Sequence, residues 1–452
     1  MNTSRSISPR IAAMMATFIL GPSPPAFSQG SLTPPGAPAP TMKTLDQIES
    51  RTPISSLPSA ISAPGSYYLM ANLETTGGSA INISADGVTL DLNGFTITST
   101  TSPAGGAGIR LSGTRRNVAI FNGNLQGGGT NTGGVYSGPG FLMGIDTAGT
   151  SQNVRVTGVN VMGCQAIGIN LGTDLSTVVT QCTVRTVGNQ GISAGTVTDS
   201  VVSDSNSAGI NAKNANNCTG IGGTSTGLFA ENASNCKGSS NSGIGLNAGN
   251  AQNCTGSSTN GTGISTGNGG KLIGCTAKSS AVGIAAGIGS TIKDCTAYLN
   301  TGNGISAGDG SVIQGCSARE NSGNGILVGA GCSVIDCAAT RNILAGIRGT
   351  DNCIIRGNTC QLNGISTGSA GIRCTGNLGN GNRIEGNNLY SNGLGIKVEG
   401  SANLIIKNSS STAFPNTAYD IVAGNNVGPI VSASGDLSGI ANGNHPWANF
   451  IY

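Results

Sequence analysis

The sequence predicts an all-β protein whose short strands coil into a solenoid, and three observations support this. A cysteine, replaced once by serine, recurs every 18 residues and then every 20 or 21: Cys182, Ser200, Cys218, Cys236, Cys254, Cys275, Cys295, Cys316 and Cys337. A Gly-Ile dipeptide, once Gly-Leu, recurs at a similar interval: Ile169, Ile192, Ile210, Leu228, Ile244, Ile264, Ile284, Ile305, Ile326, Ile347, Ile372 and Ile396. Between these positions, apolar residues alternate with others in the period of a half-buried strand. A repeat of this length is typical of stacked coils that bury their apolar rows against one another.

The composition fits this class and excludes several others. Glycine accounts for 75 of 452 residues and only 9% of residues are charged. Gly, Asn, Ser and Thr interrupt almost every window long enough for a helix. A disordered chain is usually highly charged, which this one is not. The net charge of +3 is small and dispersed, so nucleic acid is not an expected partner.

The N-terminal residues have the pattern of an export signal. Arg5 and Arg10 precede an apolar run over 11–20, and small residues surround Phe27 before Gln29. We expect a signal peptide over 1–28 and a secreted protein, extracellular or periplasmic. The run is too short to cross a bilayer, and no other long apolar segment follows.

The remaining chain divides into a linker, a solenoid and a closing segment. Residues 29–64 are predicted to form a Pro-rich linker and an N-terminal cap, and 426–452 a closing segment. A left-handed solenoid needs an aliphatic residue at every sixth position, but Thr198 and Asp204 follow Ile192 at that spacing. The sequence therefore predicts a right-handed parallel β-helix of roughly 13–15 coils over 65–425. The stretch between Ile109 and Ile145 exceeds one coil and is expected to carry an inserted loop.

Two segments carry a resemblance to a known family. Residues 64–69 read Pro-Gly-Ser-Tyr-Tyr-Leu, and residues 85–94 read Ala-Asp-Gly-Val-Thr-Leu-Asp-Leu-Asn-Gly. Together with the later coils they resemble secreted bacterial right-handed β-helix repeat proteins of the pectate-lyase-like superfamily. The resemblance covers about residues 65–425. It implies the architecture and not a particular reaction.

The chain has thirteen cysteines, and those that recur at the coil length are expected to form an interior column of free thiols. Alternation along each strand points the recurring cysteine inward, where a thiol packs as a small apolar group. Cysteines outside the main column are the better candidates for a disulfide: Cys332, Cys353, Cys360 and Cys374. No CxxC pair is present and His445 is the only histidine, so no metal site is expected.

An asparagine commonly precedes the Gly-Ile dipeptide: Asn189, Asn206, Asn241, Asn260, Asn300, Asn321 and Asn342. Asparagine tolerates a left-handed backbone, so these residues are expected to take that conformation at a corner of each coil.

No catalytic signature of the resembled superfamily can be carried over to this chain. Hydrolases need paired carboxylates, and lyases that act on uronates need a cation and a base. The chain has no Asp-Asp pair and no histidine within the coils. The catalytic residues therefore stay unknown. No cofactor is expected; calcium is left open, although no calcium-binding repeat is present.

Charged residues gather in the later coils and give the candidate ligand site. Arg348, Arg373 and Lys397 each follow a Gly-Ile and are expected to stack outward as a basic stripe. Asp351 and Glu399 are expected near it, and further charged residues are expected to gather at a corner of the coil: Arg319, Glu320 and Arg341. One interpretation of these charged residues is a solvated surface without a ligand. The other is a groove that binds an acidic glycan.

Two hypotheses about function follow. The first is an exported, non-catalytic β-helix that presents a strand face for carbohydrate binding, adhesion or envelope structure, with a polysaccharide as partner. The alternative is a polysaccharide lyase or glycoside hydrolase that acts on an acidic polysaccharide.

Overall fold

The computed structural model describes residues 50–452, apart from 366, 368, 376–378, 413–416 and 433–434. The predicted signal peptide, and the predicted linker as far as residue 49, lie outside the described residues. Residues 51–452 form one structural unit, and in its described ranges this unit contains strands and turns without a helix. In particular, these ranges hold no helix with the length and apolar character of a membrane span.

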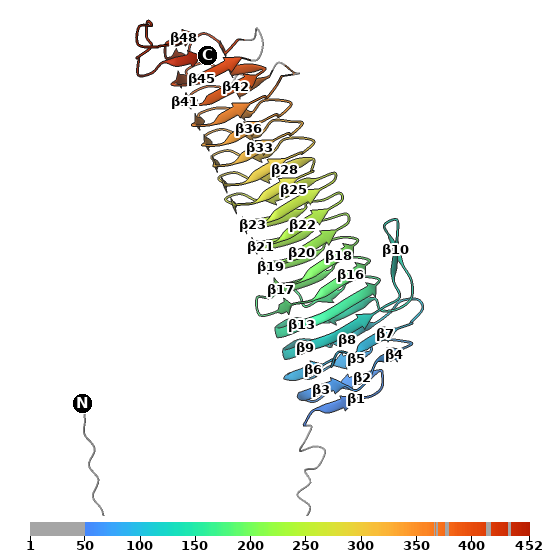
Figure 1. The fold of residues 1–452 in the computed structure, drawn as a ribbon. Coiled ribbons are helices and arrows are strands. Elements are labelled where there is room, and N and C mark those ends of the chain that lie inside the picture. The colour runs from blue at the N-terminus through green and yellow to red at the C-terminus, as the bar shows by residue number, and fades with distance from the viewer. Residues whose placement is uncertain (1–49, 366, 368, 376–378, 413–416, 433–434) are drawn as a thin grey trace, which may run out of the picture. The chain divides into compact units, whose positions relative to one another are not determined.

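The unit is a parallel β-solenoid of about 18 turns whose strands stack in chain order (Figure 1). This confirms the predicted all-β parallel solenoid. The predicted number of 13–15 coils was too low, because successive turns take only 18, 20 or 21 residues over much of the chain. Strands also begin at Thr52, within the segment predicted as a cap. The right-handed sense stays a prediction.

Each turn adds one strand to each of three parallel ladders. Ladder 1 contains β2 (Ser59–Ile61), β5 (Ile81–Ile83), β8 (Ala107–Leu111), β12 (Met143–Thr147), β14 (Ile169–Asn170), β17 (Ile192–Thr198), β19 (Ile210–Asn216), β21 (Leu228–Ser234), β23 (Leu246–Gln252), β25 (Thr262–Thr266), β28 (Val282–Ala286), β31 (Ile305–Ala307), β34 (Ile326–Val328), β37 (Ile347–Gly349), β40 (Ala370–Cys374), β43 (Leu394–Val398) and β46 (Tyr419–Ile421).

Ladder 2 shares β17, β19, β21 and β23 with ladder 1, since these long strands turn a corner. Its other strands are β1 (Thr52–Ile54), β3 (Gly65–Leu69), β6 (Val88–Asp91), β9 (Arg115–Gln126), β13 (Ser151–Cys164), β15 (Val178–Thr180), β26 (Lys271–Ile273), β29 (Thr291–Lys293), β32 (Val312–Gln314), β35 (Ser333–Ile335), β38 (Ile354–Arg356), β41 (Arg383–Glu385), β44 (Leu404–Ile406) and β47 (Asn426–Val427).

Ladder 3 shares β9 and β13 with ladder 2. Its other strands are β4 (Leu73–Thr75), β7 (Thr96–Ser99), β16 (Thr183–Val187), β18 (Val201–Ser205), β20 (Thr219–Gly222), β22 (Lys237–Ser240), β24 (Thr255–Ser258), β27 (Thr276–Lys278), β30 (Thr296–Tyr298), β33 (Ser317–Arg319), β36 (Ala338–Thr340), β39 (Thr359–Gln361), β42 (Asn388–Asn392), β45 (Ser409–Thr412), β49 (Asn449–Ile451) and β48 (Ile430–Ser432). The predicted closing segment thus supplies the last strands of this ladder.

The predicted insertion is an antiparallel hairpin of β10 (Thr130–Thr132) and β11 (Val135–Ser137). It projects beside the ladders toward the later turns (Figure 1).

The Gly-Ile dipeptides build ladder 1. Their aliphatic side chains stack in register and are fully buried, as Ile326 and Ile347 are. The prediction that Ile244 belongs to this row was wrong. The next dipeptide, Gly245-Leu246, supplies the member instead, and Leu246 pairs with Leu228 and Ile264. Leu246 lies 18 residues from each neighbour, which the turn length requires.

The recurring cysteines form an interior column in which the side chains of Cys254, Cys295, Cys316 and Cys337 each accept a hydrogen bond from the backbone of the preceding turn. The backbone N–H of Cys236 donates to Cys254 Sγ at 3.4 Å. Serine and asparagine serve in the same slot, since Cys182 N donates to Ser200 Oγ and Cys337 N to Asn358 Oδ1. The slot therefore selects a small side chain that can accept a hydrogen bond.

All thirteen cysteines are buried and free, which confirms the predicted thiol column. The four that were the better candidates for a disulfide are free as well: Cys332, Cys353, Cys360 and Cys374.

We expect all thirteen thiols to titrate after denaturation without reductant. Burial raises the pKa of Cys164 to about 12 and that of Cys182 to about 11. The folded protein should therefore react slowly with iodoacetamide at pH 8. Because these thiolates are disfavoured only in the folded state, stability should fall as pH rises above about 8.5. Each disulfide would remove two thiols from the count, so a titration that finds eleven or fewer would contradict the prediction that all thirteen cysteines are free.

Buried asparagines form further columns, and this corrects the expected role of the residues before Gly-Ile. Asn321 and Asn342 are at most 2% exposed, and Asn321 Nδ2 donates to Asn342 Oδ1 at 2.9 Å. None of the seven asparagines takes a left-handed φ, but only Asn300, Asn321 and Asn342 are buried. In these three turns the left-handed backbone belongs to the preceding residue, such as Arg341 with a φ of 53°. The asparagine turns inward because its amide satisfies both the next side chain and a backbone carbonyl, Ala318 O.

The segment over 85–94 has a structural role. The Asp91 carboxylate accepts hydrogen bonds from the Asn93 backbone N–H at 2.7 Å and from Asn122 Nδ2 at 3.2 Å. Arg51 lies 3.0 Å away on its other oxygen. Asn93 takes a left-handed φ of 53°, so these contacts hold the tight turn after β6.

Candidate functional site

The predicted basic stripe forms on ladder 1. Arg348 on β37, Arg373 on β40 and Lys397 on β43 are register partners on successive strands. Asp420 on β46 continues the row. Arg348 Nε donates to Thr375 Oγ1 at 3.2 Å, and no residue in the described part of the chain forms an ion pair with it. Arg348 is the stripe cation with the least charge compensation.

Carboxylates compensate the other two cations. Glu399 Oε1 lies 2.8 Å from Arg373 Nη2 and 3.3 Å from Lys397 Nζ. Lys397 Nζ also lies 3.7 Å from Asp420 Oδ2. Burial raises the pKa of Glu399, but the hydrogen bonds from Arg373 and Lys397 outweigh it and hold that pKa below its usual value. The stripe is therefore less cationic than its sequence implies.

The remaining predicted site residues form separate contacts. The Asp351 carboxylate accepts the backbone N–H of Asn380 at 2.9 Å. Glu320 Oε1 lies 3.9 Å from Arg319 Nε and 3.8 Å from Arg341 Nη1, at the corner between ladders 3 and 1. Exposed ion pairs of this length contribute about 0–1 kcal/mol and do not by themselves form a site.

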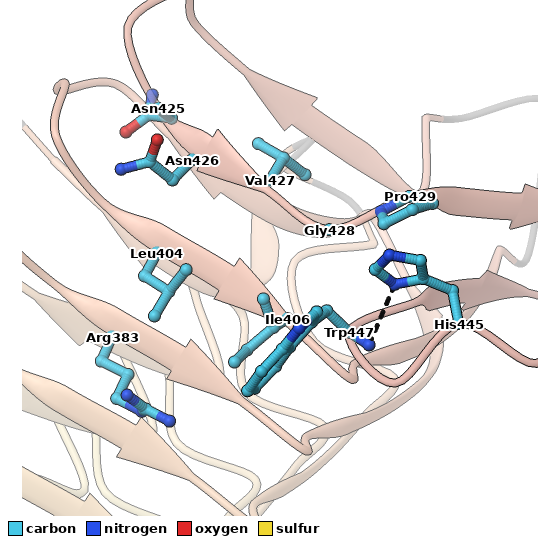
Figure 2. A pocket seen from close by; sticks show the side chains of 10 residues that line it. All are labelled: Arg383, Leu404, Ile406, Asn425, Asn426, Val427, Gly428, Pro429, His445 and Trp447. Carbon is cyan, nitrogen blue, oxygen red and sulfur yellow. Dashed lines mark hydrogen bonds between the residues drawn. The ribbon is translucent and has the colours of Figure 1, made fainter. Parts of the chain in front are cut away.

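A groove of about 570 Å³ opens over ladder 2 at the last turns (Figure 2). We call it the Trp447 groove. Strands β41, β44 and β47, with the residues that flank β47, supply one side, and the segment that leads into β49 supplies the other. Its lining residues are Arg383, Leu404, Ile406, Asn425, Asn426, Val427, Gly428, Pro429, His445 and Trp447.

The indole of Trp447 is the main apolar surface of this groove. It lies beside Ile406 (Figure 2) and is 46% exposed. The Trp447 backbone N–H donates to His445 Nδ1 at 3.2 Å. A Cβ on Gly428 would overlap the Trp447 carbonyl oxygen, so glycine permits this close approach. The Trp447 backbone is thus held by a hydrogen bond at its N–H and by close packing against Gly428 at its carbonyl.

Charged side chains support one side of the indole. Lys407 Nζ lies 5.0 Å from the centre of the Trp447 ring, within the range of a cation–π contact. Glu385 Oε1 lies 3.4 Å from Lys407 Nζ, and Glu385 Oε2 lies 2.7 Å from Arg383 Nε. The Arg383 guanidinium holds the pKa of Glu385 below its usual value. Glu385 therefore stays ionised and positions both cations.

Sequence reasoning missed this groove. It treated the only tryptophan and the only histidine as parts of a closing segment. The available signal was the tryptophan itself, since it is the only one in a chain of which just 4% is aromatic. Its exposure depends on how residues 445–449 pack on ladder 2, which no local pattern reveals.

No group of three or more His, Cys, Asp or Glu side chains suited to a metal is present in the described ranges.

Comparisons with known proteins found solved structures only. No family model matches the chain, and no curated protein matches it. The chain is similar to the A-module of mannuronan C-5 epimerase AlgE6 from Azotobacter vinelandii, at 14% identity and a TM-score of 0.30, over 80% of this chain and 91% of that one. It is similar to the Dettilon tailspike protein at 16% identity and a TM-score of 0.25, over 86% of this chain and 62% of that one. The periplasmic alginate epimerase AlgG matches at 13% identity and a TM-score of 0.24, over 86% of this chain and 76% of that one. Function has to be argued from the site itself.

Proposed function

We propose that this protein is an exported, non-catalytic β-helix protein that binds carbohydrate, with the Trp447 groove as its binding site. The observation that carries the proposal is the half-exposed indole of Trp447 beside the apolar side chains of ladder 2. Tryptophan is usually buried, so a tryptophan that is exposed at a well-packed backbone segment is typical of a binding surface.

The chemistry of the groove suits a sugar ring. A pyranose has an apolar C–H face, and its C–H groups are attracted to the negative face of an indole. Hydroxyl groups at the ring edge need donors and acceptors, which Asn426, His445 and the Arg383 guanidinium provide. Arg383 and Lys407 add positive charge, so an acidic sugar is the favoured ligand class.

The pKa directions of two carboxylates bear on the alternative of a glycoside hydrolase. A glycosidase needs a carboxylic acid whose pKa is raised so that it can donate a proton at neutral pH. Glu385 and Glu399 both have lowered pKa values because cations bind them. These two carboxylates are suited to positioning cations and not to proton donation, which weighs against either of them as the acid of a glycoside hydrolase.

The single tryptophan makes the proposal directly testable. We expect an acidic oligosaccharide such as oligogalacturonate or oligomannuronate to change the intrinsic fluorescence of Trp447 on titration. Replacing Trp447→Ala should weaken binding at least tenfold in calorimetry, because the stacking surface is lost. Phe229→Ala is the matched control, since Phe229 is an exposed aromatic on β21, 41% exposed, and binding should not change.

Other outcomes would redirect the proposal. Equal affinity of Trp447→Ala and the unaltered protein would reject the groove. Binding that survives Trp447→Ala but is lost in Arg348→Glu would transfer the site to the stripe. Shortening of the oligosaccharide by the unaltered protein would overturn the non-catalytic assignment.

A further inference from the structure

The β10–β11 hairpin is held over distant turns by one carboxylate. Asp204 Oδ1 accepts hydrogen bonds from Tyr136 Oη at 2.7 Å and from Asn131 Nδ2 at 2.5 Å, both on the hairpin. Asp204 Oδ2 accepts one from Thr186 Oγ1 at 2.9 Å, on the preceding turn. These contacts join residues as many as 73 positions apart.

The base of the hairpin is fixed as well. Gln165 Nε2 donates to the Gly138 carbonyl at 2.6 Å. Tyr136 lies over Gly188, where a Cβ would come within 3.2 Å of the Tyr136 Cβ. The hairpin is therefore a positioned wall and not a free loop.

A pocket of about 390 Å³ lies between this wall and the corner of the following turns. The corner side includes Asn206, Gly223 and Asn241, from three successive turns. The side chains of Asn206, Asn241 and Ser242 make no hydrogen bond to another described residue. The pocket thus presents amides and a hydroxyl that have no partner within the described chain.

The charge of this pocket is opposite to that of the Trp447 groove. Among its lining residues, Asp204 carries the only charge and no cation is present. Burial raises the pKa of Asp204, but hydrogen bonds from Tyr136, Asn131 and Thr186, helped by the charge of Arg185 outside the pocket lining, outweigh it, and the net pKa is lowered. Asp204 is ionised at neutral pH and would repel an acidic ligand. A carboxylate has about four acceptor positions, and the three donors leave one for a ligand.

We propose that the pocket between the β10–β11 hairpin and the corner at Asp204 binds an uncharged polyhydroxylated ligand, a neutral saccharide unit. Its volume is within the range of small-ligand sites, roughly 300–1,000 Å³. Neighbouring hydroxyls can donate to the free acceptor position of Asp204 and exchange hydrogen bonds with Asn206 and Asn241. The site is separate from the Trp447 groove: eleven steps of ladder 3 divide β18 from β49, which at about 4.8 Å a step is about 50 Å.

The test uses the full protein carrying Trp447→Ala, so that the other site does not contribute. The probes are cellohexaose, mannohexaose, laminarihexaose and, as the acidic comparison, hexagalacturonate, observed by saturation-transfer NMR and calorimetry. We expect at least one neutral hexasaccharide to bind and hexagalacturonate not to bind. The double variant Asn206→Ala/Asn241→Ala should weaken that binding at least tenfold.

The control pair is Asn232→Ala/Asn250→Ala, exposed asparagines of β21 and β23 outside the pocket, which should leave binding unchanged. Failure of all three neutral probes, or equal binding by the pocket variant, would overturn the proposal. Neither result bears on the Trp447 groove, because the test protein lacks the indole on which binding in that groove is proposed to depend.

Discussion

Replacing Gly245→Ala is expected to cause a large loss of stability. A Cβ at this position would lie 2.5 Å from the Ser257 backbone nitrogen and 2.6 Å from the Gly263 carbonyl oxygen. Both are backbone atoms, which cannot move aside as a flexible side chain can. Relief requires separating two turns whose ladder includes the hydrogen bond from Gly245 N to Thr262 O at 2.8 Å. We expect a loss of at least about 3 kcal/mol.

Gly267→Ala is the matched control, since a Cβ there meets nothing within 4 Å. It should change stability by less than about 1 kcal/mol. Urea unfolding followed by circular dichroism gives the comparison. Because each turn contacts only its neighbours, hydrogen exchange should quicken around β23 and stay slow in the late turns. Equal midpoints for the two variants would show that close approach does not explain the Gly-Ile pattern.

Replacing Asn342→Ala is also expected to cause a large loss of stability. Asn342 Oδ1 accepts from Asn321 N at 3.1 Å and Asn321 Nδ2 at 2.9 Å. Its Nδ2 donates to Ala318 O and Asn363 Oδ1 at 3.0 and 2.8 Å. Alanine would leave buried donors of Asn321 unpaired at about 1–3 kcal/mol each, so we expect a loss of roughly 3–5 kcal/mol. The midpoint of urea unfolding measures it.

Asn232→Ala tests whether burial is the reason. Asn232 also belongs to an asparagine row, donating to Asn214 Oδ1 at 3.1 Å and accepting from Asn250 at 3.0 Å, but its side chain is exposed. Water can replace these partners, so the loss should stay below about 0.5 kcal/mol. A loss as large as that of Asn342→Ala would mean that the row itself, and not the unpaired buried groups, stabilises the solenoid.

Several features of the fold and stripe could be predicted because they repeat at the turn length. The stacking of Arg348, Arg373 and Lys397 followed from their shared place after Gly-Ile. The thiol column followed from the spacing and the alternation of Cys275 and its neighbours. Such residues contact the equivalent residues one turn away, so their spacing along the chain shows which of them are neighbours in space. The same argument failed for Ile244, where two candidate dipeptides stand two residues apart.

The sequence by itself determined the all-β solenoid, the inward columns and the rows of equivalent charges, since periodic positions must stack when turns have equal length. Only the tertiary structure decided which carboxylates neutralise the stripe, that Asp204 receives the β10–β11 hairpin, and that Trp447 stands half-exposed over ladder 2. These contacts join residues of different turns at positions that do not repeat. Their partners are fixed by the path of an insertion or of the final segment across the surface, and one sequence carries no periodic signal for that path.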